Sequence, residues 1–276
     1  MKLEGFEDCL ARCGGRCWRP KEIVGPDQVR FLSRRNFLRG VIAGATALTG
    51  LTGGLSAFGR DERQLEKMIT EPQADFIFGR IYFRIGDWNT DMQEVGLMGG
   101  SEINLLKRVL EVTNIKTQAR ETVIFLNQPV AFTSPFLYMT AHGQIGLTPE
   151  EENRLKTLIL SGAFLFGETC AGRGYGFDRD FKSLMQRIFP DRPMQQLEMS
   201  HPLYHCFYSI EKIMGGDKLV DPFMEGIDID GRLAVLYTTN DLGCAWEGHP
   251  CSPGGEEQRD HAFQLGINMI VYALTH

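Results

Sequence analysis

Pro135-Phe136-Leu137-Tyr138-Met139-Thr140 is a short and almost wholly apolar run, which is typical of a strand buried on both faces of a sheet. A clear helix start follows, because Thr148-Pro149-Glu150-Glu151 places threonine at the N-cap, proline at N1 and glutamate at N3, as in a capping box. Gly162 can end that helix in the left-handed conformation, and residues 163–167 form another buried apolar run. These segments predict a strand–helix–strand unit of a parallel sheet.

The same alternation continues in both directions along the chain. Residues 76–83, 122–126 and 232–239 are rich in aromatic and β-branched residues and are expected to be strands. Helical stripes of apolar residues begin at the expected N-caps Ser101 and Asp178, and a third stripe closes the chain. The pattern predicts an α/β fold with a mostly parallel sheet, although the connection over residues 126–135 is short for a crossover between parallel strands.

Composition and charge limit the class of protein. The chain has 276 residues, of which 43% are apolar and 23% charged, so it is neither a disordered chain nor a collagen or coiled coil. Residues 1–59 carry 9 Lys/Arg and 5 Asp/Glu, a net charge of +4, whereas residues 60–276 carry 20 and 30, a net charge of −10. An acidic main part without a basic stripe argues against a nucleic-acid partner.

The first 59 residues have the features of an export signal. Ser33-Arg34-Arg35-Asn36-Phe37-Leu38-Arg39 matches the twin-arginine pattern, and an uncharged, mildly apolar stretch follows over residues 40–58. Ala57-Phe58-Gly59 offers a small-x-small cleavage site, so the mature domain is expected to span residues 60–276 as a single α/β unit in the periplasm. A retained membrane anchor at residues 40–58 and a buried Gly/Ala-rich helix are the alternatives.

The segment before the twin arginines has two interpretations. It contains Cys9, Cys13 and Cys17, whose regular spacing suggests a metal-binding leader, although three cysteines alone close no tetrahedral site. A true start codon at Val29 would leave a signal peptide with a short basic n-region, and residues 1–28 would then be an over-extended start.

Polar side chains gather directly after the expected strands. Ligands of such folds sit beyond the carboxyl ends of the strands, so these residues predict a site at that edge. Catalytic candidates are His142, Glu168, Cys170 and His201, and ligand-binding candidates are Asp87, Trp88, Asp241, Trp246 and Glu247.

Three chemistries remain open for this set. Cys170 is a possible nucleophile with His142 or His201 as its base, oriented by Glu168, or it can form a disulfide with Cys244 in an oxidising compartment. A metal site drawn from these residues and Cys244 is the third, but no HxxxH or CxxC pair supports it, so no metal ligand is assigned. No motif identifies a cofactor.

Two further features bear on the ligand. Trp88 and Trp246 beside acidic residues suit stacking on sugar rings, although buried structural tryptophans are commoner. His142 and Glu168 follow neighbouring strands, so we expect them to form a titratable pair or a structural hydrogen bond between the two loops.

Several segments together resemble a known bacterial family. They are Phe76-Ile77-Phe78-Gly79-Arg80-Ile81-Tyr82, Gly86-Asp87-Trp88-Asn89-Thr90-Asp91, Tyr138-Met139-Thr140-Ala141-His142-Gly143, Phe164-Leu165-Phe166-Gly167-Glu168-Thr169-Cys170-Ala171-Gly172, His201-Pro202 and Leu242-Gly243-Cys244-Ala245-Trp246-Glu247. As an ordered series over residues 75–276, they resemble the "domain of unknown function 4159" family. The family is similar to class I glutamine amidotransferases in fold, which implies a flavodoxin-like, three-layer sandwich with a mostly parallel sheet.

The resemblance does not imply the amidotransferase reaction. Amidotransferases carry a Gly-x-Cys-x-Gly turn, whereas Glu168 occupies the first glycine position here and should raise the pKa of the Cys170 thiol. We therefore expect an exported protein that binds a small polar or carbohydrate-like ligand; if it is an enzyme, it is a hydrolase and not a glutamine amidotransferase. The alternative is an inactive domain that binds an envelope protein, with membrane contact only through an uncleaved signal segment.

Overall fold

A computed structural model describes residues 76–92 and 100–276, and within them a seven-stranded sheet has the order β2-β1-β3-β4-β7-β6-β5. Strands β2, β1, β3, β4 and β7 are parallel to one another. β6 pairs antiparallel with β7, and β5 pairs antiparallel with β6. The predicted α/β class with a mostly parallel sheet is confirmed. The strands are β1 (Phe78–Ile81), β2 (Thr122–Ile124), β3 (Phe136–Ala141), β4 (Phe164–Thr169), β5 (Gln195–Gln196), β6 (Glu225–Ile229) and β7 (Arg232–Thr238).

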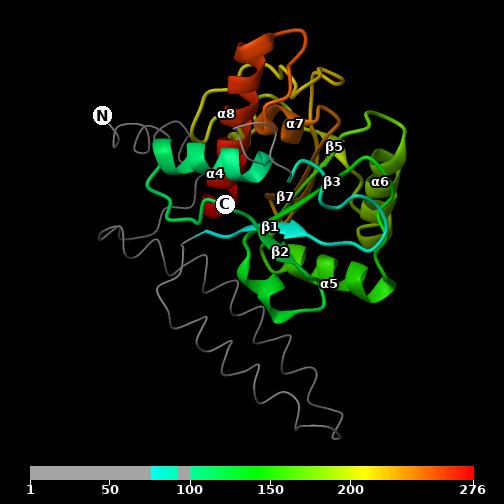
Figure 1. The fold of residues 1–276 in the computed structure, drawn as a ribbon. Coiled ribbons are helices and arrows are strands. Elements are labelled where there is room, and N and C mark those ends of the chain that lie inside the picture. The colour runs from blue at the N-terminus through cyan, green and yellow to red at the C-terminus, as the bar shows by residue number, and fades with distance from the viewer. Residues whose placement is uncertain (1–75, 93–99) are drawn as a thin grey trace, which may run out of the picture.

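Helices cover both faces of the sheet (Figure 1). One apolar core lies between the sheet and α4, α7 and α8, and the other lies between the sheet and α5 and α6. The helices are α4 (Ser101–Val112), α5 (Pro149–Leu160), α6 (Gly176–Ile188), α7 (Leu242–Glu247) and α8 (Gly255–Thr275), with short 3-10 helices η2 (Pro129–Thr133) and η3 (Pro202–Tyr204).

The helix starts follow the sequence signals in part. The capping box of α5 is present, with Thr148 and Glu151 each accepting from the other's backbone N–H. The other two predicted caps, Ser101 and Asp178, lie one and three residues after the observed N-caps Gly100 of α4 and Tyr175 of α6. Asp178 instead lies in the first turn of α6, where its carboxylate accepts from Gly174 N at 2.6 Å and still favours the helix N-terminus.

The short connection between β2 and β3 contains η2, and β3 pairs with β1 on the side away from β2. The chain therefore leaves β1 in one direction, returns, and continues in the other through β3, β4 and β7. The direction of winding reverses between β1 and β3. In open α/β sheets this reversal leaves a crevice at the carboxyl ends of the two strands, which is where ligands bind.

A buried ion pair joins β1 to α4. Arg80 and Glu102 are 0% and 1% exposed, and Arg80 Nη1 donates to Glu102 Oε1 at 2.5 Å. Burial opposes the charge of each partner. For Arg80, Glu102 together with Tyr138 and Asp91 outweighs burial and raises the pKa of the guanidinium, whereas for Glu102 burial outweighs Arg80 and raises the pKa of the carboxyl group. Because removal of one partner leaves an uncompensated buried charge, we expect the loss of either residue alone to destabilise the fold.

The predicted leader, its three cysteines and the polar stretch after Arg60 lie outside the described residues. Within residues 76–92 and 100–276, no helix combines the length and the apolar character needed to cross a bilayer.

Replacing Arg80 with Met tests the buried pair. The R80M variant should lose about 3–5 kcal/mol of unfolding free energy, because Glu102 remains buried without its partner. The double variant R80M/E102M should recover part of this loss. Urea unfolding measures both, and R154M, which breaks only the exposed Arg154–Glu150 pair on α5, should cost less than about 0.5 kcal/mol. An R80M cost as small as that of R154M would contradict the assignment.

Candidate functional site

The loop after β1 is held in place by hydrogen bonds from the buried side chain of Arg80. Its guanidinium donates to the carbonyl of Trp88 at 2.6 and 2.8 Å and to the carbonyl of Thr90 at 2.8 Å. Two acidic residues in this loop are thereby positioned at the carboxyl edge, Asp87 on the outside and Asp91 on the inside. Asp91 has φ of 61°, in the left-handed region that aspartate tolerates better than most residues.

Asp87 and His142 form an exposed pair across the reversal between β1 and β3. His142 Nδ1 lies 2.6 Å from Asp87 Oδ2, and the backbone N–H groups of His142 and Gly143 donate to the same carboxylate at 3.1 and 3.2 Å. Their side chains are 57% and 40% exposed, respectively for His142 and Asp87. Partial burial opposes ionisation, but the hydrogen bonds outweigh it and lower the pKa of Asp87, so a carboxylate orients the imidazole.

Glu168 is fully buried near the carboxyl end of β4, in the interior of the protein next to this edge of the sheet. Its carboxylate accepts from Leu242 N at 2.6 Å, from Gly243 N at 2.8 Å and from the hydroxyl of Tyr138. Burial and the nearby Asp241 raise its pKa well above the ordinary value. Glu168 therefore fixes the first turn of α7 against β3 and β4.

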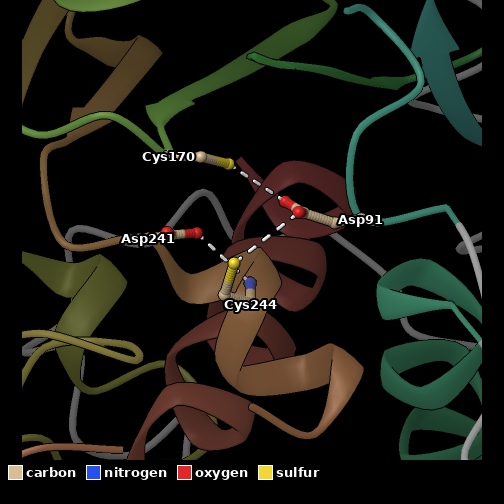
Figure 2. Close-up of side chains that lie close together, drawn as sticks. All are labelled: Asp91, Cys170, Asp241 and Cys244. Atoms are coloured by element: carbon tan, nitrogen blue, oxygen red, sulfur yellow. Dashed lines mark hydrogen bonds between the residues drawn. The ribbon is translucent and has the colours of Figure 1, made fainter. Parts of the chain in front are cut away.

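Figure 2 shows four side chains that point toward one another: Asp91, Cys170, Asp241 and Cys244. Cys170 Sγ donates to Asp91 Oδ2 at 3.2 Å, and Cys244 Sγ lies 3.6 Å from Asp91 Oδ1. Asp241 is the N-cap of α7 and accepts from Cys244 N at 3.2 Å. One ligand-type atom from each residue lies within 4.8 Å of the others, and all four residues are buried. We call these residues the Asp/Cys quartet.

The environment of the two thiols disfavours the thiolate. The hydrogen bond with Cys244, then burial and the carboxylates of Asp241 and Asp91, raise the pKa of Cys170 well above its usual range. The hydrogen bond with Cys170 lowers the pKa of Cys244, but burial and the neighbouring carboxylates, chiefly Asp241, together outweigh it and raise that pKa to about 12. The expected direction for Cys170 is confirmed, but Glu168 contributes less than these neighbours.

The disulfide between Cys170 and Cys244, one of the alternatives that the sequence left open, is not present. Cys170 and Cys244 are both free thiols, although they do lie side by side as a disulfide between them would require. Within the described residues, Cys170 Sγ contacts Asp91, Cys244 and Thr140 Oγ1 at 3.3 Å, and no histidine hydrogen-bonds to it. The geometry therefore provides no Cys–His pair for nucleophilic catalysis.

The expected pairing of His142 with Glu168 was wrong. Each has a different set of partners, because Glu168 points into the protein between β4 and α7, whereas His142 stays at the surface with Asp87. The sequence argument placed both residues at the correct edge of the sheet but could not tell the inward side chain from the outward one.

Two other candidates, Trp246 and His201, do not lie at the exposed carboxyl edge of the sheet. Trp246 is fully buried in the core beneath α8, where its Nε1 donates to Ala262 O at 2.9 Å, so it cannot stack on a sugar. His201 is the N-cap of η3 and lies 5.5 Å from the ring of Tyr272, whose hydroxyl accepts from Leu233 N at the start of β7. His201 is thus at the amino edge of the sheet, opposite the site.

The remaining candidates lie near the carboxyl edge. Trp88 is half-buried and packs edge-on against Tyr82 at 5.1 Å between ring centroids. Glu247 is buried at the end of α7 and accepts from His249 Nε2 at 3.1 Å. Sequence reasoning missed His249, Arg80 and the role of Asp91, although Asp91 belongs to the polar run that follows the first strand.

Comparison with known proteins identifies one matching family. A model described as "Domain of unknown function (DUF4159)" matches residues 78–274, which run from β1 into α8 and contain every residue of the Asp/Cys quartet and the Asp87–His142 pair. No curated protein matches the chain.

Replacing Glu168 with Gln tests its role in holding α7. Gln keeps the shape but has one acceptor oxygen, so at least one buried donor loses its partner, at a cost of about 1–3 kcal/mol in unfolding free energy. Chemical denaturation at neutral pH measures the loss, and the exposed E150Q change on α5 should cost less than about 0.5 kcal/mol. Equal stability of E168Q and the parent protein would show that the three hydrogen bonds do not need a carboxylate.

Proposed function

Because the chain belongs to the DUF4159 family, whose description names no activity, we propose from the site itself that this is an exported protein that binds a small polar, carbohydrate-like ligand at the carboxyl edge of its sheet. The exposed Asp87–His142 pair carries this proposal. It is a preorganised acid–base pair presented to solvent at the reversal between β1 and β3, where ligands of open α/β sheets bind.

Topology supports the proposed site. The five parallel strands have the order β2-β1-β3-β4-β7, which in chain order is 2-1-3-4-5, and this order supports a flavodoxin-like sheet. On this support we propose that the fold is a flavodoxin-like, class I glutamine amidotransferase-like three-layer sandwich. The amidotransferase activity does not follow with the fold, because no histidine of residues 76–92 and 100–276 hydrogen-bonds to Cys170 and the surroundings raise the pKa of its thiol.

Aromatic side chains beside the pair favour a carbohydrate-like ligand. Tyr82 packs against Trp88 on one side and against Phe125 on the other, with ring centroids 5.1 and 4.8 Å apart. Phe125 is exposed, Tyr82 and Trp88 are half-buried, and Trp88 directly follows Asp87 in the chain. An amphipathic ring next to charged and hydrogen-bonding groups is the combination that suits a sugar, which offers both an apolar face and hydroxyl groups.

The pair also defines the chemistry available to an enzyme of this type. The lowered pKa of Asp87 keeps its carboxylate ionised through neutral pH, where it orients the His142 ring. In a hydrolase, His142 would act as the general base on a water molecule. Ligand binding is the primary proposal. Hydrolysis of a bound sugar is a separate question, which an assay for the released product answers.

A ligand screen with matched variants tests the proposal. Binding of a mono- or disaccharide should raise the melting temperature of the mature protein in proportion to the logarithm of ligand excess over Kd. D87N and H142A should weaken that binding at least about tenfold, since each removes a hydrogen-bonding group worth about 1.4 kcal/mol or more. The unliganded melting temperature should change little, and H249A, which alters a different half-exposed histidine, should bind normally.

The screen also tests the alternative function. If no sugar, amino acid or other small polar compound stabilises the protein, the proposed ligand site is wrong. An inactive domain that binds another protein of the cell envelope then becomes the better explanation.

Export is proposed from the twin-arginine pattern at Arg34 and Arg35 and from the uncharged stretch that follows it. The mature protein in the periplasm should begin at Arg60, as determined by N-terminal sequencing. The R34K/R35K variant should accumulate as precursor, because the twin arginines are the recognised feature. A mature N-terminus upstream of Ser33, or release of the lysine variant at the normal rate, would contradict export by this route. Retention of residues 40–58 in a membrane fraction would indicate an anchor instead.

A further inference from the structure

The Asp/Cys quartet lies behind the exposed pair and is unused by the proposed ligand binding. We propose that Asp91, Cys170, Asp241 and Cys244 form a closed site for one divalent transition-metal ion of borderline softness, with Zn²⁺ as the probe ion. The inference does not depend on the sugar ligand, because none of the four residues belongs to the Asp87–His142 pair.

The spacing of the donor atoms fits four-coordinate zinc. Zn–S bonds of about 2.3 Å and Zn–O bonds of about 2.0–2.2 Å place neighbouring ligand atoms of a tetrahedron about 3.3–3.8 Å apart. The sulfur–oxygen distances from Asp91 to Cys170 and to Cys244 are 3.2 and 3.6 Å. All four donor atoms lie within 4.8 Å of one another, so small side-chain movements close the set around an ion.

Charge makes a cation the natural partner of this cluster. Asp91 and Asp241 are 6% and 3% exposed, and within the described part of the chain neither forms an ion pair with Lys or Arg. Buried carboxylates are normally paired or bound to a metal, because an uncompensated charge in a buried site is costly. Two thiolates and two carboxylates around Zn²⁺ carry the same net charge as the four thiolates of common structural zinc sites.

The ligands are held by their neighbours before any ion binds. Glu168 fixes the backbone of the turn that carries Cys244, and Thr140 Oγ1 lies 3.3 Å from Cys170 Sγ. Gly243 allows this close packing, since a Cβ there would lie 2.6 Å from Asp91 Oδ2 and 2.9 Å from Glu168 Oε1. Such surrounding contacts orient metal ligands and raise affinity.

The donor set predicts a structural rather than a catalytic metal ion. Four protein ligands fill a tetrahedral shell and leave no position for water, which separates this centre from a catalytic zinc site. On binding, each thiol gives its proton to the solvent as its sulfur bonds the ion, so the step needs no oxidant or reductant. A rival set exists, because Cys244, Glu247 and His249 also lie within 4.8 Å of one another.

Metal titration of the reduced, chelator-treated mature protein tests the site. Zn²⁺ should bind with 1:1 stoichiometry in competition with a chromophoric chelator and should raise the melting temperature. Co²⁺ should give tetrahedral ligand-field bands and thiolate-to-cobalt charge transfer. C170S and D91N should each lose the 1:1 binding and change the cobalt spectrum. C206S removes a buried thiol that contacts Leu203 O and Asn268 O, and it should bind as the parent does.

Three results would overturn the proposal. The first is a folded parent protein that shows no 1:1 binding. The second is loss of binding in H249A with retention in C170S, which would assign the ion to the rival set. The third is a Cys170–Cys244 disulfide in the protein as isolated, together with no zinc binding after reduction. The cobalt spectrum of the parent protein keeps the test decisive even if a variant fails to fold, because it reports thiolate ligation directly. Failure of the sugar screen would leave all of these outcomes unchanged.

Discussion

The fully buried carboxylate of Glu168 is the constraint on which the carboxyl edge depends. It lies in β4 and binds the hydroxyl of Tyr138 in β3 and the first backbone N–H groups of α7, so one side chain joins two strands to the helix that supplies Cys244. A helix of six residues has little intrinsic stability and needs such an anchor. Burial and the nearby Asp241 raise the pKa of Glu168, so the position that makes it an anchor also disfavours its charged form. A cation bound by the Asp/Cys quartet would favour the charged form of Glu168 and so oppose the effect of burial on its pKa.

The order of the elements was largely predictable, and the failures have physical explanations. The capping box and the apolar runs of β3 and β4 are local signals, and they were confirmed. The hairpin of β6 and β7 was missed although Asp230-Gly231, with φ of 54° and 82°, is a strong two-residue turn signal. β5 is only two exposed residues long, so nothing in its sequence distinguishes it from a loop.

The site was predicted at the correct edge but with the wrong pairs. Sequence order shows which residues follow a strand, but the direction of each side chain depends on packing. Glu168 falls on the buried side of the edge and His142 on the exposed side, and Trp246 is drawn into the core because α8 covers it. Arg80 lies within an apolar strand, and nothing in the local sequence predicts that its charge is paired with Glu102, 22 residues later. Long-range pairing of this kind is set by the fold and not by local pattern.

The exposed pair and the buried quartet share a single short loop. Asp87 faces His142 at one end of it, Asp91 faces Cys170 at the other, and Arg80 holds the carbonyl groups between them. A change in Arg80 therefore disturbs both centres and cannot reveal which of them a function uses. Changes at His142 and at Cys170 can reveal it, because these residues directly follow different strands, β3 and β4, and contact the loop at opposite ends. The one guanidinium that β1 buries thus explains why two chemically different groups of residues, one open to solvent and one closed, are held a few residues apart on the same sheet edge.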